Sequence, residues 1–581
     1  MLQWWPNISV QHPPSTTPRR KKPTVYLVII LIWLALTGWA IFDIHQTFLT
    51  VWGPLCLLNF IFLAYFWLNG TKDVVYPLSY YSSLRHVRRL SHHRALTAAE
   101  RAEEPMIFFL YCTADDFEER TLAENLKQEY GNVRFFILDD SKQTSYQERV
   151  NAFAGAHDIE VVRRSVHSGH KAGNLNHFLL GRDDYDYFVI LDSDEIIPPN
   201  YVRKTLCYFT ERVGVVQCSH RAAVGGNLFE ETFRRGVDSH WPVYQQVKDR
   251  FGFMHLMGHG AMISRRCYQA VPGGFPEMVA EDLCFSIEAR LRGFITAFCA
   301  SVVCVEAYPI SYLAFKTRHS KWTQGNMEFI RHYSWPIFSS SLHWWEKLDI
   351  LLFTYNLPLT AVFVIYLFLN IVVFPLFGVN LGLTWWMLIV TVVFLLAPML
   401  NDFIWHLPRI GVRRMFFYTL GVMLLYGSLF YISAKASLFA FLGKKAQFLV
   451  TPKSNTHLSL RDAFVANRSE MLFGLGLCAV ALLCGHSLLP VLLLAIPALL
   501  SPIMALLSND PVPGQKGGLA EHAKAAEPVQ APAQESNPPQ GTAPTKPEAR
   551  RRKARLYSGW RPITCLLTRG LPPGYVTYYR K

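Results

Sequence analysis

The chain has 581 residues, of which 51% are hydrophobic and 17% are charged, and its formal net charge is +14. One hydrophobic core stops growing well below this length, so at least two structural units are expected. The apolar residues gather in long blocks, which excludes an ordinary soluble protein and indicates a membrane protein. Basic residues beside a membrane attract anionic lipid, so the positive charge requires no nucleic-acid partner.

Five apolar stretches are long enough to cross a bilayer, because a helix needs ~20 residues to span ~30 Å of hydrocarbon. They cover residues 25–42, 48–68, 350–377, 383–404 and 471–507. The last stretch can fold as a hairpin around Gly485-His486-Ser487, which predicts about six spans in all. The first stretch lacks the small-residue cleavage site of a secretory signal and is followed at once by a second span, so we interpret it as an anchor.

The basic residues predict the orientation of these spans. Arg19-Arg20-Lys21-Lys22 precedes the first span, four arginines lie between residues 85 and 94 after the second, and the link between the spans has no Lys or Arg. The positive-inside rule then places the N-terminus and the large following domain in the cytoplasm, on a multi-pass cytoplasmic (inner) membrane protein. The segment 415–442 has basic residues at both ends, so we expect an interfacial helix, with a transmembrane span as the alternative.

These observations predict a division of the chain into eight segments. The segments are a cytoplasmic N-terminus (1–23), two transmembrane helices (24–69), a cytoplasmic α/β domain with interfacial helices (70–345), two transmembrane helices (346–406), an interfacial helix (407–443), a loop (444–470), a transmembrane hairpin (471–507) and a disordered basic tail (508–581). The tail is rich in Pro, Ala and Gln before an Arg-rich run, which is typical of a solvated or lipid-touching segment. A docking site for a partner is the alternative.

Within the predicted cytoplasmic domain, apolar runs alternate with helical patterns. The runs at 106–111, 133–138 and 187–191 each end in a polar turn. Short apolar runs separated by helices predict a parallel sheet that is covered on both faces. Ligands of such sheets bind beyond the carboxyl ends of the strands, where these polar turns lie.

Two acidic motifs follow these runs directly. Asp139-Asp140 ends the second run, and Asp192-Ser193-Asp194 ends the third. Two carboxylates at one strand end can hold Mg²⁺ or Mn²⁺ and bridge it to a diphosphate. A lone Asp-x-Asp often only caps a helix, but its place after a strand, together with a second acidic pair, favours a metal site at Asp192 and Asp194.

Further motifs supply the other groups that a transfer reaction needs. Lys171 could neutralise phosphate, although exposed lysines are common at helix starts. Glu281-Asp282 opens a helical pattern, where an acidic residue can serve as a cap or, as we hypothesise for Asp282, as a general base. Arg318 and Lys321 could stabilise a leaving diphosphate. The indole of Trp322 could stack on a sugar ring.

Taken in this order, the motifs resemble those of the family 2 membrane glycosyltransferases with a GT-A (Rossmann-like) fold. That family is typified by bacterial cellulose synthase and includes the curdlan, hyaluronan and osmoregulated periplasmic glucan synthases. The resemblance covers about residues 95–460. Phe448-Leu449-Val450-Thr451, with Lys453, is similar to the family's gating loop. Ala280 stands where the family has Thr, and Lys321 stands where it has Arg.

The resemblance implies a role for each matched residue. It implies donor contacts at Thr113, Asp115, Asp139, Asp140, Lys171, Asp192, Asp194, Arg318 and Lys321, with the uridine at Asp139 and Asp140 and the metal at Asp192 and Asp194. It implies acceptor contacts at Trp322, His259 and Gly260, catalysis by Asp282 beside Glu281, and gating by Phe448, Val450, Thr451 and Lys453. The expected fold is a GT-A domain inserted in a helical membrane domain.

The expected function is the processive transfer of glucose from UDP-glucose to a β-glucan that leaves through the protein's own channel. The expected partners are the UDP-sugar donor, the growing polysaccharide, the lipid bilayer and periplasmic accessory export proteins. A non-processive transferase that acts on a lipid or a short acceptor is the alternative. A catalytically silent sugar-nucleotide sensor or assembly scaffold is a third alternative, but such a protein should have lost one of the carboxylates, and none is lost.

Overall fold

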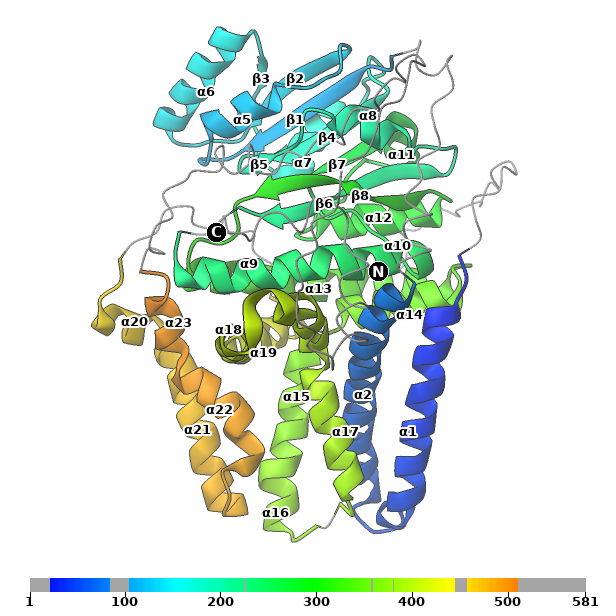
Figure 1. The fold of residues 1–581 in the computed structure, drawn as a ribbon, viewed down its shortest axis with the longest axis vertical. Coiled ribbons are helices and arrows are strands. Elements are labelled where there is room, and N and C mark those ends of the chain that lie inside the picture. The colour runs from blue at the N-terminus through cyan, green and yellow to red at the C-terminus, as the bar shows by residue number, and fades with distance from the viewer. Residues whose placement is uncertain are drawn as a thin grey trace, which may run out of the picture.

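The computed structural model describes residues 21–83, 104–223, 226–356, 359–379, 381–444 and 457–509. Figure 1 shows two layers, with a sheet and its helices above a group of long helices that run roughly parallel to one another. Helices α9 (Leu228–His240) and α13 (Tyr312–Ser339) lie between these layers. The predicted gating loop residues Phe448, Val450, Thr451 and Lys453 lie outside the described residues.

The upper layer contains one mixed sheet with the strand order β3-β2-β1-β4-β7-β6-β8-β5. Its strands are β1 (Ile107–Thr113), β2 (Val133–Asp139), β3 (Glu160–Val162), β4 (Tyr187–Asp192), β5 (Glu195–Ile196), β6 (Val213–Ala222), β7 (Ala261–Ser264) and β8 (Ile295–Glu306). Strands β1 to β4 are parallel, as the apolar runs predicted. The short strand β7 pairs antiparallel with both β4 and β6, which the sequence analysis did not predict.

Both faces of the sheet are buried, because the central strands are apolar at successive positions. In β1, Phe109 and Tyr111 enter one core cluster, whereas Phe108 and Leu110 enter the cluster on the opposite face. The covering helices are α5 (Glu119–Asn125), α6 (Thr144–His157), α7 (His170–Leu179), α8 (Tyr201–Leu206), α10 (Gln246–Phe251), α11 (Arg265–Ala270) and α12 (Glu281–Leu291), with a π-helical turn, η1 (Trp241–Gln245), after α9. This arrangement confirms the predicted α/β fold class.

Five helical segments in the described part of the chain are long and apolar enough to cross a membrane. They are Thr24–Phe48 (α1), Gly53–Ser82 (α2), Trp385–Phe441, Arg468–Gly485 (α21) and Leu489–Leu506. The last comprises η4 (Leu489–Val491), α22 (Leu492–Leu499) and α23 (Ser501–Leu506), and a short helix α20 (Leu460–Ala466) precedes α21. A shorter apolar segment, Phe363–Leu376, crosses α15 (Leu359–Phe368), η2 (Leu369–Val373) and α16 (Phe374–Leu376).

The stretch 350–377, expected as one span, is divided in the structure. Helix α14 (Trp344–Thr354) ends before α15 begins at Leu359. Polar contacts hold α14 against the sheet domain, since Glu346 accepts a hydrogen bond of 2.9 Å from Arg290 and Asp349 accepts one of 2.7 Å from the backbone of Phe253. The apolar segment therefore starts later than the hydropathy pattern indicated.

The long segment Trp385–Phe441 contains α17 (Trp385–Leu396), η3 (Ala397–Met399), α18 (Leu400–Ser428) and α19 (Phe430–Phe441). Gly411 has φ 76° and ψ 167°, so α18 is kinked there. Figure 1 places α18 and α19 directly beneath α9 and α13, near the upper ends of the long helices. The assignment of 415–442 as an interfacial helix stays a prediction.

Candidate active site

Strand register brings the predicted donor residues to one edge of the sheet. Thr113 at the end of β1 is aligned with Asp139 of β2, and Cys112 beside it is aligned with Asp192 of β4. Three strands therefore end at the same level, and their polar turns face one cavity that is lined by Thr113, Asp140 and Asp192 among others. This alignment follows from the parallel pairing that the apolar runs predicted.

Lys171 joins two of the predicted motifs. It lies in the first turn of α7, and its ammonium donates hydrogen bonds to the Asp192 carboxylate and, at 2.9 Å, to the carbonyl of Gly258. Burial by itself lowers the pKa of Lys171, but the neighbouring Asp192 outweighs burial and raises the pKa well above its ordinary value. Lys171 is therefore a fixed positive charge at the strand edge, where a diphosphate would be neutralised.

Asp192 and Asp194 both line the cavity, as a metal site requires. The Asp192 side chain is 37% exposed, so its carboxylate can reach a ligand in the cavity. Two hard carboxylate oxygen donors beside a fixed ammonium suit Mg²⁺ or Mn²⁺ together with a diphosphate. The residues present therefore fit such an ion.

Asp139 and Asp140 are held by arginines that the sequence analysis did not single out. Asp139 is 1% exposed and accepts hydrogen bonds from Arg163 (2.8 Å) and from the backbone of Ser141 (2.8 Å). Asp140 accepts one of 2.9 Å from Arg164. Arg164 is itself buried and also donates to the carbonyl of His170 at 2.8 Å, so these pairs connect β2 to the start of α7.

A second cluster of hydrogen bonds organises the turn after β1. Asp116, which was not predicted, accepts hydrogen bonds from the hydroxyls of Thr113 (2.9 Å) and Ser193 (2.7 Å). Asp115 has φ 59° and accepts from the backbone N–H groups of Lys142 (2.9 Å) and Gln143 (2.8 Å). Asp116 thus links the β1 turn to the Asp192-Ser193-Asp194 turn. The sequence signal that could have identified Asp116 is its position as a second carboxylate just beyond the end of a predicted strand.

The Glu281-Asp282 pair begins α12, as predicted. Both residues line the cavity. Burial and then the negative charge of Asp282 raise the pKa of Glu281 to about 7, and burial also raises the pKa of Asp282. Gly258 has φ 88°, and a Cβ there would lie 3.4 Å from Asp282 Oδ2. The pair is therefore desolvated and close to the backbone that Lys171 contacts, which gives Asp282 the elevated basicity that a general base needs.

Arg318, Lys321 and Trp322 lie on α13 and line the same cavity. The Arg318 guanidinium lies over the Trp322 ring, 4.6 Å from its centroid, and over the Tyr308 ring at 5.5 Å. Trp322 is 39% exposed, which leaves ring surface available to a ligand in the cavity. Burial lowers the pKa of Lys321.

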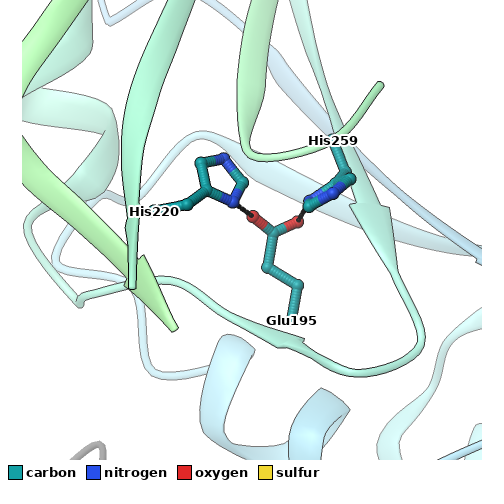
Figure 2. Close-up of side chains that lie close together, drawn as sticks. All are labelled: Glu195, His220 and His259. Carbon is teal, nitrogen blue, oxygen red and sulfur yellow. Dashed lines mark ion pairs between the residues drawn. The ribbon is translucent and has the colours of Figure 1, made fainter. Parts of the chain in front are cut away.

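His259 and Gly260, predicted to contact the acceptor, belong to a buried cluster of ionisable groups. Figure 2 shows Glu195 pointing between His220 and His259. Suitable atoms of these three residues lie within 4.8 Å of one another, so by spacing they could hold a metal ion. A Cβ at Gly260 would overlap Glu195 and His220, so glycine is required there. His259 lines the cavity, whereas Glu195 and His220 lie behind it.

The cavity has a volume of 1570 Å³ and continues from the strand edge towards the apolar helices. Its lining includes Asp140, Asp194 and Asp282 as well as residues of the helices below. Those from the helices include Leu395, Met399, Asn401, Asp402, Tyr418, Tyr426, Leu493 and Leu494. Residues of the strand edge, the Glu281-Asp282 pair and the apolar helices thus line one cavity.

Residues 187–398 match the protein family described as glycosyl transferase family group 2. The matched segment contains Asp192-Ser193-Asp194, Glu281-Asp282 and the α13 motif. A curated relative, cellulose synthase 1 of Komagataeibacter xylinus, is 23% identical over 234 residues, which is 37% of this chain and 14% of that protein. This chain therefore contains a segment that is similar to glycosyl transferase family group 2 and to a part of a cellulose synthase.

Two solved structures are also similar. The mannosyltransferase PcManGT from Pyrobaculum calidifontis, in complex with GDP-Man and Mn²⁺, is 18% identical, with a TM-score of 0.38 over 66% of this chain and 99% of that one. TarS of S. aureus is 15% identical, with a TM-score of 0.30 over 58% of this chain and 53% of that one. The segment that matches the family begins in the mixed-sheet domain and extends into the apolar helices that are joined to it.

Proposed function

We propose that this protein transfers glucose from UDP-glucose to the non-reducing end of a growing β-glucan and passes the polymer through its own membrane helices. The observation that carries the proposal is the shared cavity, whose lining runs from Asp192 and Asp282 to Leu395 and Leu493 of the apolar helices. An acceptor bound in that space extends from the base towards the membrane. The donor-binding end of the cavity lies at the strand edge, on the side that the basic residues predict to be cytoplasmic.

In the proposed reaction, the Asp282 carboxylate takes the proton of an acceptor hydroxyl. The hydroxyl oxygen then forms a bond to the anomeric carbon of glucose, while the bond from that carbon to the diphosphate oxygen breaks and UDP leaves with the electron pair. Lys171 and Arg318 offset the charge of the leaving diphosphate. Asp192 and Asp194 would hold a divalent cation, which would supply further positive charge there.

Trp322 would support the acceptor sugar, because its exposed indole lines the cavity that Asp282 and the apolar helices also line. Asp139 and Asp140 would bound the uridine site. Phe448, Val450, Thr451 and Lys453 would cover the donor after it binds, as the resemblance implies. Export beyond the membrane would use periplasmic accessory proteins.

A second function is favoured by the apolar lower part of the cavity, where Leu395, Leu396, Leu493 and Leu494 face the same space. Such a lining suits the hydrocarbon chain of a lipid acceptor, and a single transfer would then complete the reaction. This alternative retains Asp282 as base and Asp192 and Asp194 as metal ligands. The two functions differ in the size of the product, which is a long polymer for the processive synthase and a lipid with a single added sugar for this alternative.

The test is the incorporation of radiolabelled glucose from UDP-glucose by purified protein in vesicles with Mg²⁺, followed by product sizing and linkage-specific digestion. Long product from the wild type and none from Asp282→Asn supports the processive synthase. A labelled product that extracts into organic solvent supports the lipid acceptor instead. Glu148→Gln is the matched control, since Glu148 is an exposed carboxylate on α6.

A further inference from the structure

His259 lies between two buried carboxylates. Its Nδ1 is 3.3 Å from Oε2 of Glu195, and its Nε2 is 3.2 Å from Oε2 of Glu306. Neither oxygen of Glu195 has a hydrogen-bond partner in the described structure, and that side chain is 0% exposed. Figure 2 shows the Glu195 carboxylate directed at His259 on one side and at His220 on the other. A buried carboxylate without any donor requires a nearby positive charge.

The hydrogen bonds of His220 define its protonation. The Gln217 side-chain oxygen accepts from the backbone N–H of Met257 at 2.7 Å, so its nitrogen must be the atom that faces Nε2 of His220 at 3.1 Å. That amide nitrogen is a donor, so Nε2 of His220 is an acceptor and carries no proton. The proton is then on Nδ1, which donates to Glu306 at 3.1 Å.

The same contacts weigh against a metal ion. Both ring nitrogens of His220 already have partners, and its nearest approach to Glu195 is 3.8 Å. Only Glu195 and His259 would remain as ligands with atoms available to an ion. Both ring nitrogens of His259 lie at ion-pair distance from a carboxylate oxygen, which is the arrangement expected of an imidazolium between two carboxylates.

We propose that His259 positions three segments of the active site by bridging the buried carboxylates of Glu195 and Glu306. This inference rests on the proposed function, because the positioned segments are those to which donor and acceptor roles are assigned there. Glu195 directly follows Asp194 of the predicted metal site. Glu306 ends β8, two residues before Tyr308, on whose ring Arg318 lies. His259 itself follows Gly258, whose carbonyl accepts from Lys171.

The electrostatics agree with this geometry. Burial by itself lowers the pKa of His259, but Glu306 and Glu195 outweigh burial and raise the pKa to about 10. Burial raises the pKa of Glu306, but His259 outweighs burial and lowers the pKa to about 2. His259 is a positioning residue in this proposal and takes no part in proton transfer to substrate.

The test compares His259→Gln with the double variant Glu195→Gln/His259→Gln. The single variant leaves two buried carboxylates without a cation, whereas the double variant removes one of them. We expect hydrogen–deuterium exchange in the peptides that contain Asp194 and Gly258 to become about 10-fold faster in the single variant, because an orphaned buried charge loosens its surroundings. We expect the double variant to recover at least half of the protection. His157→Gln, on the surface helix α6, is the control.

Unchanged exchange in His259→Gln, or a double variant that is worse than the single one, overturns the proposal. A stoichiometric metal ion, found by mass spectrometry in the wild type, kept by Asp192→Asn and lost in His259→Gln, also overturns it in favour of a metal site. If His259→Gln does not fold, Glu306→Gln replaces it, with a smaller acceleration expected and no acceleration overturning the proposal. Exchange needs no substrate, so a wild type that fails to bind UDP contradicts the proposed function alone.

Discussion

Asp139-Asp140 and Glu281-Asp282 are both pairs of adjacent carboxylates near the carboxyl edge of the sheet, but their neighbours differ. The first pair is bonded to Arg163 and Arg164. In the second pair burial dominates, so that the pKa of each carboxyl is raised. Carboxylates that are paired with arginine keep a fixed charge and geometry, whereas a desolvated carboxylate can gain and lose a proton near neutral pH. This difference supports the proposal that the first pair binds the donor and the second transfers a proton.

The sharpest test of the comparison is Asp282→Asn. The amide has nearly the same shape but cannot take a proton, so we expect kcat to fall by about 10³-fold with little change in the KM for the donor. Sugar incorporation in vesicles measures the loss, and Glu148→Gln should retain wild-type activity. A variant with more than a tenth of the wild-type kcat would place the base elsewhere.

The arginine pairs give the next largest effect. Arg164→Gln leaves Asp140 without its charged partner inside the fold, and we expect a loss of about 3 kcal/mol in the free energy of unfolding. Thermal unfolding in detergent should show this as a clear drop in melting temperature, with a weaker affinity for UDP. Arg134→Gln is the matched control, because its pair with Glu160 is 3.6 Å long and half exposed, and it should lose less than about 1 kcal/mol. Equal losses in the two variants would contradict a binding role for the buried pair.

These pairs also show what could be predicted from the sequence. The apolar runs predicted β1, β2 and β4 because consecutive apolar residues are typical of a strand buried on both faces, and the strand ends then located Asp139 and Asp192. The partners Arg163 and Arg164 follow the three-residue strand β3, which is too short to give a pattern. Glu195 and Glu306 are distant in sequence and meet through the pairing of β5 with β8. Contacts between distant strands have no local signal, so the charge cluster around His259 was missed.

The pH dependence of activity probes the second acidic pair. Burial and the neighbouring Asp282 raise the pKa of Glu281 to about 7, and burial also raises the pKa of Asp282. A base must be unprotonated, so we expect kcat/KM to increase about 10-fold from pH ~6 to a plateau above pH ~8. Glu281→Gln removes the neighbouring negative charge and should move the rising limb to lower pH. A profile that is flat over this range would show that proton removal from the acceptor does not limit the rate.

The smallest expected effect concerns the cation on α13. Lys321 stands where the resembled family has Arg, and burial lowers the pKa of its ammonium. A guanidinium stays charged at every relevant pH and can bind two phosphate oxygens at once, so Lys321→Arg should lower the donor KM by about fivefold, equivalent to about 1 kcal/mol. Lys435→Arg on α19 is the control for a Lys-to-Arg change outside the cavity lining. An increase in KM would mean that the space at Lys321 is fitted to the smaller ammonium, and the donor phosphates would then be held mainly by Lys171.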